Sequence, residues 1–317
     1  MYKVLITDVS TSILQEGLRE FGFEVTNKPD IDQAYVEQHI HEYDGIIVRS
    51  KITLFADTLL KAEKLKFIGR PGSGLDLIDL TYCLQNGIAV CRSATSNSNA
   101  VAEHALGMLL AWMNNLVRSN NEVKSMIWRR EANRGFEIMG KTVGIIGFGN
   151  TGSRFAKKLL GLDVKVLAYD KYKERYAKAY PHVQESNLEE ICKNADVLSF
   201  HLPLNEETKY YLNTDLIEAF EKPVVVINTS RGPIVDTQAL INGLDKGMIR
   251  GACLDVLENE NPQKYTDKQQ DMYTNLFSRD NVMLSPHVAG WSAKSKIQME
   301  SFLLDEIEKK VNPTLET

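Results

Sequence analysis

The stretch Lys141–Asp170, KTVGIIGFGNTGSRFAKKLLGLDVKVLAYD, carries the pattern that decides the fold. A short apolar and β-branched run at its start predicts a strand that is buried on both faces. Gly147, Gly149 and Gly152 follow with the spacing G-x-G-x-x-G. The first glycine allows a tight turn, the second lets the backbone approach a pyrophosphate, and the third lets the next helix pack closely. Because amides at the start of that helix can bind phosphate, the stretch predicts a dinucleotide site.

Asp170 stands at the end of a second predicted strand, residues 164–169. It follows the last glycine at close to the ~20 residues expected for an acid that binds the adenosine ribose. Its carboxylate would accept hydrogen bonds from the 2′- and 3′-hydroxyls and would repel a 2′-phosphate, which predicts NAD in preference to NADP. A turn without a ligand is the alternative interpretation, but here strand, turn, helix, strand and acid stand in the expected order.

The composition is that of an ordinary globular protein, with 317 residues, 43% hydrophobic and 25% charged. The net charge is −5 and the basic residues are scattered along the sequence, so no basic cluster that would bind nucleic acid is predicted. The four cysteines lie far apart, without disulfide or metal-ligand spacing, and no metal site is predicted. The longest apolar run, residues 105–113, is shorter than the ~20 residues of a membrane span. The chain starts with a strand rather than a signal segment, so we expect a cytoplasmic protein.

Strands alternate with helices along the chain, which predicts doubly wound parallel sheets of the α/β class. We expect two such domains. Residues 1–95 and 291–317 would form a discontinuous, flavodoxin-like substrate-binding domain, and residues 96–290 a Rossmann NAD-binding domain. The active site would lie in the cleft between them, with the polar segment 93–99 as a hinge.

Two segments of the chain are expected as connections or arms. The polar segment Pro262–Asn275 lies between two predicted strands and is longer than most connections, which are functional or mobile at that length. Residues 119–139 are polar and basic and are interpreted as an arm. The apolar helix predicted from Ala100 to about Val117 would be buried between domains or subunits.

Three predicted strands end in side chains that suit hydroxy-acid chemistry, and open α/β sheets bind ligands at the carboxyl ends of their strands. Arg231 follows one strand and can hold a carboxylate with two hydrogen bonds. His287 follows another and can exchange a proton near neutral pH. Glu258 and Glu260 follow a third, and an acid there could stabilise an imidazolium. Taken singly, each residue could instead be a surface ion pair or a structural group.

Together these motifs resemble the NAD-dependent D-isomer-specific 2-hydroxyacid dehydrogenases over nearly the whole chain. Residues 140–149 resemble the family's strand and nucleotide turn, and residues 201–204 (HLPL) its HxPL turn. Residues 228–232, 254–260 and 285–287 resemble its arginine, glutamate and histidine motifs. The resemblance implies a catalytic set in which an arginine orients the substrate carboxylate, a histidine is the acid/base and a glutamate pairs with it: Arg231, His287 and Glu260.

The resemblance also implies which residues contact the cofactor. Asp255 would contact the nicotinamide or order the site, and a glutamate at position 260 argues against formate as substrate. The implied cofactor-binding residues are Gly147, Phe148, Gly149, Asn150, Thr151, Gly152, Asp170, His201, Pro203, Thr208, Thr229, Ser230, Asp255, His287 and Gly290.

Within the family, residues 47–50 and 68–76 resemble the substrate loops of the D-3-phosphoglycerate dehydrogenases. This implies oxidation of D-3-phosphoglycerate to 3-phosphohydroxypyruvate, a reaction of serine biosynthesis. Arg49 and Arg70 would face the phosphate, and Arg130 would reach a neighbouring subunit. A homodimer through residues 100–134 is implied as well. The full set of implied substrate contacts is Arg49, Ser50, Arg70, Ser73, Gly74, Arg231 and His287.

The sequence departs from the phosphoglycerate pattern at Pro71, at Trp291 and in the long segment after residue 261. The chain also ends without the regulatory domain of longer relatives, so no serine feedback through such a domain is expected. One alternative is therefore a 2-oxo acid reductase acting on an unphosphorylated acid such as glycerate, lactate or glyoxylate. In that case Arg49 and Arg70 would only pair with acids. A second alternative is an NAD-sensing binding protein that resembles the family's transcriptional co-repressors.

Overall fold

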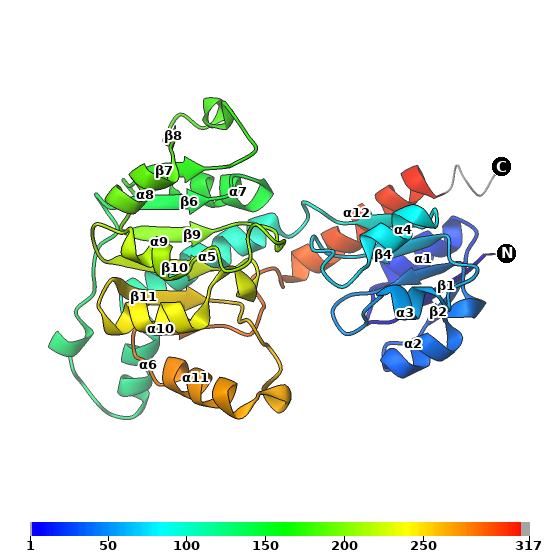
Figure 1. The fold of residues 1–317 in the computed structure, drawn as a ribbon, viewed down its shortest axis with the longest axis horizontal. Coiled ribbons are helices and arrows are strands. Elements are labelled where there is room, and N and C mark those ends of the chain that lie inside the picture. Colours follow the sequence, from blue (N-terminus) through cyan, green and yellow to red (C-terminus); the bar gives the residue numbers. More distant parts are fainter. Residues whose placement is uncertain (1, 312–317) are drawn as a thin grey trace. The chain divides into compact units, whose positions relative to one another are not determined.

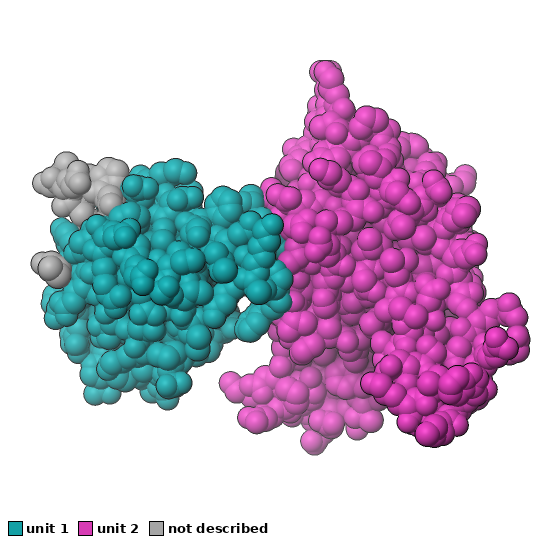
Figure 2. Space-filling model, turned by 180° about the vertical axis from the view of Figure 1, so that it is seen from behind, with its two compact units in different colours: residues 1–97, 291–317 teal, residues 98–290 magenta. Residues whose placement is uncertain are grey.

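The computed structural model describes residues 2–311. They divide into two compact units (Figure 2). The smaller unit comprises the chain up to Asn97 together with the chain from Trp291 onward, and the larger unit is Ser98–Gly290. Within the described residues no helix is both long and apolar enough to cross a bilayer.

The smaller unit is a five-stranded sheet with the order β2-β1-β3-β4-β5, in which every neighbouring pair is parallel. Figure 1 labels β1, β2 and β4 of this sheet. This is the flavodoxin-like order, as predicted. The strands are β1 (Lys3–Ile6), β2 (Glu24–Asn27), β3 (Gly45–Ile47), β4 (Phe67–Arg70) and β5 (Ala89–Arg92). The helices are α1 (Ser12–Glu20), α2 (Gln33–His39), η1 (Ile40–Glu42), α3 (Ala56–Leu59), α4 (Leu80–Gln85) and α12 (Ala293–Lys310).

Apolar side chains project from both faces of this sheet, and helices cover them on each side. On one face they meet α2, α3 and α4 around Leu5, Ile46 and Ile68. On the other face Ile6 and Ile47 meet α1 and α12. The last helix of the chain therefore completes the first sheet, which is why the unit is discontinuous in sequence.

The larger unit is a seven-stranded, all-parallel sheet with the order β12-β11-β10-β9-β6-β7-β8. The order reverses at β6, as in a Rossmann fold. Its strands are β6 (Thr142–Ile146), β7 (Lys165–Tyr169), β8 (Val183–Glu185), β9 (Val197–Phe200), β10 (Val224–Asn228), β11 (Ile249–Leu254) and β12 (Val282–Leu284). Its helices are α5 (Ser98–Met113), α6 (Leu116–Lys124), η2 (Glu131–Asn133), α7 (Asn150–Leu159), η3 (Tyr176–Ala179), α8 (Leu188–Asn194), α9 (Thr214–Glu218), η4 (Gly232–Ile234), α10 (Thr237–Asp245), η5 (Pro262–Lys264) and α11 (Asp267–Phe277).

Helices cover both faces of the larger sheet as well. The apolar residues of α5 and α7 pack on one face, and those of α8, α9, α10 and α11 pack on the other. Helix α5 buries Ala102, Ala105, Met108 and Leu109 within this unit. The helix predicted from Ala100 therefore contributes to the core of the larger unit.

The segment Pro262–Asn275 is not the open connection that its length suggested. It holds η5 and most of α11, the crossover helix between β11 and β12. A capping box starts α11, in which Thr266 and Gln269 each bind the other's backbone. Only Tyr273 and Leu276 of this helix are buried. Most of its residues are therefore polar, and the sequence resembles that of a loop. Residues 119–139, interpreted as an arm, likewise begin in a helix, α6.

Candidate active site

The glycine turn after β6 has the geometry that a dinucleotide requires. Gly147 has φ +90°, and a Cβ on it would lie 2.5 Å from the carbonyl oxygen of His201. A Cβ on Gly152 would lie 2.1 Å from the carbonyl oxygen of Gly147, so only glycine lets α7 approach the turn. By contrast, nothing lies within 4 Å of a Cβ on Gly149. The turn is therefore tightly packed at Gly147 and Gly152 and open at Gly149. A pyrophosphate beside Gly149 would meet the start of α7 at Asn150.

Asp170 lies at the carboxyl end of β7, beside the same turn. Its carboxylate accepts hydrogen bonds from the amides of Phe148 at 2.8 Å and Tyr172 at 3.0 Å. These bonds hold the acid against the turn and leave lone pairs for ribose hydroxyls, because each carboxylate oxygen accepts two hydrogen bonds. Phe148 is buried against Tyr176, with ring centroids 4.9 Å apart, and so shapes the turn from beneath.

Two buried polar atoms of the described residues have no hydrogen-bond partner, His201 Nδ1 and Thr229 Oγ1. Both residues were predicted to contact the cofactor. Unpaired buried polar atoms are rare, and a cofactor bound beside these two atoms would give them partners. Burial also lowers the pKa of His201 to about 3, so its ring stays neutral at physiological pH. Its Nε2 lies 2.9 Å from the hydroxyl of Ser199.

Other residues of the predicted cofactor set have internal partners. The Thr208 hydroxyl donates to the carbonyl of Pro203 at 2.6 Å and closes the turn after β9. The Ser230 hydroxyl lies 2.8 Å from Asn228 Oδ1 and 3.1 Å from the carbonyl oxygen of Phe200. These contacts shape the turns after β9 and β10. Thr151 lies in the first turn of α7 and Gly290 is the last residue of the larger unit.

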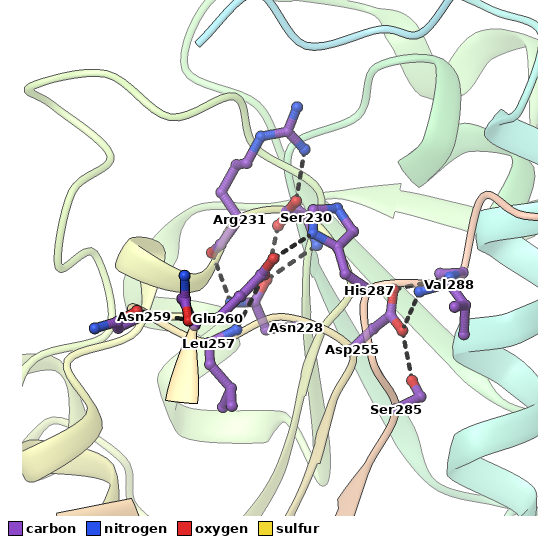
Figure 3. A network of polar contacts seen from close by, with 12 residues as sticks. Asn228, Ser230, Arg231, Asp255, Leu257, Asn259, Glu260, Ser285, His287 and Val288 are labelled. Carbon is purple, nitrogen blue, oxygen red and sulfur yellow. Dashed lines mark hydrogen bonds and ion pairs between the residues drawn. The ribbon is translucent and has the colours of Figure 1, made fainter. Parts of the chain in front are cut away.

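His287 and Glu260 form a close pair at the carboxyl edge of the larger sheet (Figure 3). Nδ1 of the histidine lies 2.8 Å from Oε2 of the glutamate, and the side chains are 47% and 42% exposed. The pair leaves Nε2 as the imidazole atom that can exchange a proton with a substrate. Glu258, the other acid that follows β11, does not pair with His287 but has other hydrogen-bond partners. It accepts from the Thr237 amide and the Tyr210 hydroxyl, both at 2.8 Å, and this contact raises the pKa of Tyr210 to about 12.

Asp255 holds the turn that carries His287. It is 1% exposed, and its carboxylate accepts from the hydroxyl of Ser285 at 2.5 Å and from the amides of Val288 at 2.9 Å and Ala289 at 2.8 Å. Its backbone carbonyl accepts from the amide of His287 at 2.7 Å. His287 adopts the left-handed conformation, φ +55°, which needs such support in a residue other than glycine. This geometry makes Asp255 an organiser of the histidine turn.

Arg231 lies after β10, on the turn that faces the Glu260 loop. Its guanidinium donates to the carbonyl of Ser230 at 2.7 Å, and its own carbonyl accepts from Asn228 at 2.8 Å (Figure 3). The two loops touch, since a Cβ on Gly232 would lie 1.8 Å from the carbonyl oxygen of Leu257. Arg231, Glu260 and His287 thus follow β10, β11 and β12, three neighbouring strands of the larger sheet.

The residues predicted to bind substrate in the smaller unit follow β3 and β4. Arg70 donates to the carbonyl of Arg49 at 3.1 Å and to that of Gly74. The Arg49 amide donates to Asp8 at 3.1 Å. The guanidinium of Arg49 lies 5.5 Å from the ring centre of Trp291, a cation–π contact. Ser50 is exposed beside Arg49, and Ser73 lies in the loop after β4.

Sequence reasoning missed two residues near these sites. Arg92 pairs in register with Arg70 at the ends of β5 and β4, and it donates to the carbonyl of Ser73 at 3.1 Å. Its position at a predicted strand end was a usable signal. His104 on α5 lies 2.9 Å from the hydroxyl of Ser285. Because His104 and Ser285 are far apart in the sequence, no local sequence pattern predicts their contact.

The chain belongs to the D-isomer specific 2-hydroxyacid dehydrogenases, since residues 106–289 match the NAD-binding domain of that family. It is 32% identical to a hydroxypyruvate reductase of Thermotoga maritima, over 98% of both chains. It is 31% identical to a D-3-phosphoglycerate dehydrogenase of Bacillus subtilis over 97% of this chain, but spans only 56% of that relative's length. Among solved structures it resembles a D-lactate dehydrogenase from Aquifex aeolicus in complex with NAD and lactic acid, with 29% identity, a TM-score of 0.84 and coverage of 99% and 96% of the two chains.

Proposed function

We propose that this enzyme transfers a hydride between NAD and C2 of a D-2-hydroxy acid, with D-3-phosphoglycerate and 3-phosphohydroxypyruvate as its substrate pair. The observation that carries the chemistry is the His287–Glu260 pair, 2.8 Å apart beside Arg231. The pair supplies a proton-transfer group and Arg231 supplies a carboxylate ligand. On this proposal the enzyme acts at the entry to serine biosynthesis.

Each group has a distinct task in the reaction. The guanidinium of Arg231 binds the substrate carboxylate and so orients C2. In oxidation, Nε2 of His287 takes the proton of the C2 hydroxyl, and Glu260 stabilises the imidazolium that forms. In reduction, the same nitrogen returns the proton to the oxygen of the 2-oxo acid. When bound at the glycine turn and Asp170, NAD supplies the hydride acceptor and its reduced form the hydride donor.

Three arginines at the carboxyl edge of the smaller sheet support a phosphorylated substrate. Arg49 follows β3, and Arg70 and Arg92 end β4 and β5 in register. Among the residues of the described chain, neither Arg49 nor Arg92 forms an ion pair with an acidic side chain. Guanidinium groups that lack acidic partners favour a dianionic phosphoryl group over the methyl of lactate. Arg49 and Arg92 are therefore proposed as ligands of the phosphate, together with Arg70, which lies in register with Arg92.

A second candidate function is reduction of an unphosphorylated 2-oxo acid such as hydroxypyruvate. Two observations favour it. Trp291 stacks over the Arg49 guanidinium and satisfies part of its charge within the protein. In addition, the Thermotoga maritima relative that matches the whole chain is a hydroxypyruvate reductase.

Initial rates of NADH formation with D-3-phosphoglycerate, D-glycerate and D-lactate distinguish the two functions. Preference for the phosphorylated acid supports the proposal. In that case Arg92→Gln should lower kcat/KM for D-3-phosphoglycerate by about 10- to 150-fold, the loss of a charged hydrogen bond, and should leave D-lactate turnover unchanged. Arg19→Gln, at an exposed position of α1, is the matched control. Turnover of only the unphosphorylated acids would overturn the substrate assignment and leave the hydride chemistry standing.

The proposal includes a homodimer formed through residues 100–134. The segment from α6 onward exposes large apolar side chains, with Leu116 54%, Trp128 72% and Met126 90% exposed. Such a cluster marks an interaction surface. Light scattering should show a dimer that Met126→Ser with Trp128→Ser converts to a monomer. A wild-type monomer would refute this part.

A cytoplasmic location belongs to the same proposal. All four cysteines are buried and unpaired, which fits a reducing compartment.

A further inference from the structure

We propose that His104, on α5, is a positioning residue for His287, acting through Ser285 and Asp255. The inference rests on the proposed acid–base role of His287. Nε2 of His104 lies 2.9 Å from the hydroxyl of Ser285 and 3.6 Å from Oδ1 of Asp255. The contact joins the helix at the start of the larger unit to the turn near its end.

The direction of each hydrogen bond follows from counting protons. Ser285 has one hydroxyl proton, and Asp255 Oδ1 lies 2.5 Å from its oxygen. The Asp255 carboxylate also accepts hydrogen bonds from the amides of Val288 and Ala289, so both of its oxygens act as acceptors in this turn. The serine proton therefore goes to Asp255, since a hydrogen bond to a carboxylate is the stronger one. The sulfur of Met108, 3.6 Å from the hydroxyl, is a weak competitor.

It follows that Nε2 of His104 is the donor to Ser285. A neutral His104 is then protonated at Nε2. The chain of donors runs from His104 to Ser285 to Asp255, and the Asp255 carboxylate in turn binds the amides of Val288 and Ala289, the two residues after His287. His104 thereby binds the Ser285 oxygen from a second direction and helps to keep its proton directed at the carboxylate.

The consequence reaches the catalytic atom through the backbone. Asp255 is 1% exposed, so a Ser285 hydroxyl that turned away would remove one of the three donors to a buried carboxylate. The turn that holds His287 at φ +55° would then be less well supported. His104 itself touches neither Glu260 nor His287 among the described contacts, and its effect should appear in turnover rather than in cofactor binding.

Two variants of His104 test the proposal with the full-length enzyme. His104→Leu removes the donor at similar volume and should lower kcat about 3- to 10-fold, with KM for NADH unchanged, because one neutral hydrogen bond is lost. His104→Gln keeps an amide donor and should stay within about twofold of wild type. Glu103→Gln on the same helix, whose carboxylate pairs with Lys158 at the surface, is the control. Equal losses in the leucine and glutamine variants would overturn the proposal.

A spectroscopic measurement tests the proton assignment without relying on turnover. In protein labelled with ¹⁵N-histidine, long-range ¹H–¹⁵N spectra at pH 8.5 should show His104 protonated at Nε2, with its signal identified by its absence in His104→Gln. Protonation at Nδ1 would overturn the proposal. Failure of the proposed function would look different, because His287→Gln would then retain full turnover while the His104 tautomer stayed as described.

Discussion

Replacing Asp255 with asparagine changes one oxygen of a buried side chain to an amide nitrogen and tests how His287, the proposed acid–base residue, is held in place. In the native turn Oδ1 accepts from Ser285 and Val288, and Oδ2 accepts from Ala289 at 2.8 Å. Asparagine has only one acceptor oxygen. If that oxygen takes the place of Oδ1, the new amide group faces the N–H of Ala289; if it takes the place of Oδ2, the amide group faces the N–H of Val288. In both orientations a hydrogen-bond donor therefore faces another donor.

The magnitude follows from this geometry. A backbone N–H that is buried without a partner costs about 1–3 kcal/mol, and Ala289 is 5% exposed. At 1.36 kcal/mol for each factor of ten, we expect kcat to fall about 5- to 150-fold, through a smaller population of enzyme with His287 in place. The affinity for NADH should change little, because the glycine turn and Asp170 are untouched.

The assay combines steady-state reduction of a 2-oxo acid with NADH titration by fluorescence. Asp196→Asn is the matched control. Asp196 accepts from the Thr142 amide at 2.8 Å and pairs with Lys222 at 2.9 Å, at the amino end of β9 and away from the site. That variant should lower Tm and leave kcat unchanged. If Asp255→Asn lost NADH affinity in step with kcat, Asp255 would be a nicotinamide contact, and wild-type kcat would refute both roles.

Three further predictions concern the chemistry and the loops around it. His287→Gln should lower kcat by about 10²- to 10⁴-fold with NADH binding retained, since a general acid–base group is lost; comparable losses in both would mean that its role is assigned wrongly. Gly232→Ala should lower both Tm and kcat, because its Cβ would meet the Leu257 carbonyl oxygen at 1.8 Å and push away the loop that carries Glu260; an unchanged Tm would show that the loop yields freely. His201, with its pKa lowered to about 3 by burial, should destabilise the fold progressively as the pH falls below about 6.5, because the unfolded chain takes up that proton first. In His201→Gln, Tm should fall less between pH 6.5 and pH 4 than in the wild type. An equal fall in both proteins would mean that other groups cause the loss of stability in acid.

Much of the site could be predicted because parallel strands make the chemistry local in sequence. Each buried strand reads as a short apolar run, and the residue that follows it lies at the carboxyl edge of the sheet. Arg231, Glu260 and His287 each follow such a run, so their meeting required only the sheet order. The glycine turn was predictable for a related reason, since its backbone conformation at Gly147 excludes other residues.

The features that escaped prediction depend on contacts that no local pattern records. Helix α11 buries only Tyr273 and Leu276. Its sequence therefore shows little of the apolar periodicity by which an amphipathic helix is predicted, and the segment was interpreted as a polar connection. The capping box at its start was a readable signal. The residue pattern alone left Glu258 and Glu260 open, and only the family resemblance favoured Glu260. The two differ in side-chain direction, because Glu258 accepts from Thr237 and Glu260 pairs with His287.

The division of the residues between the two units suggests why one chemistry can serve several acids. Arg231, Glu260 and His287 all belong to the larger unit, together with the nucleotide turn and the Asp255 contacts that hold His287. On the proposed mechanism, every 2-hydroxy acid would use these same groups. The arginines proposed to bind the rest of the substrate belong to the smaller unit, where Arg49 follows β3 and Arg70 and Arg92 end β4 and β5. None of the hydrogen bonds that hold His287 involves these residues. Substrate choice can therefore change through positions such as Arg92 and Trp291, while the geometry of proton transfer stays as it is.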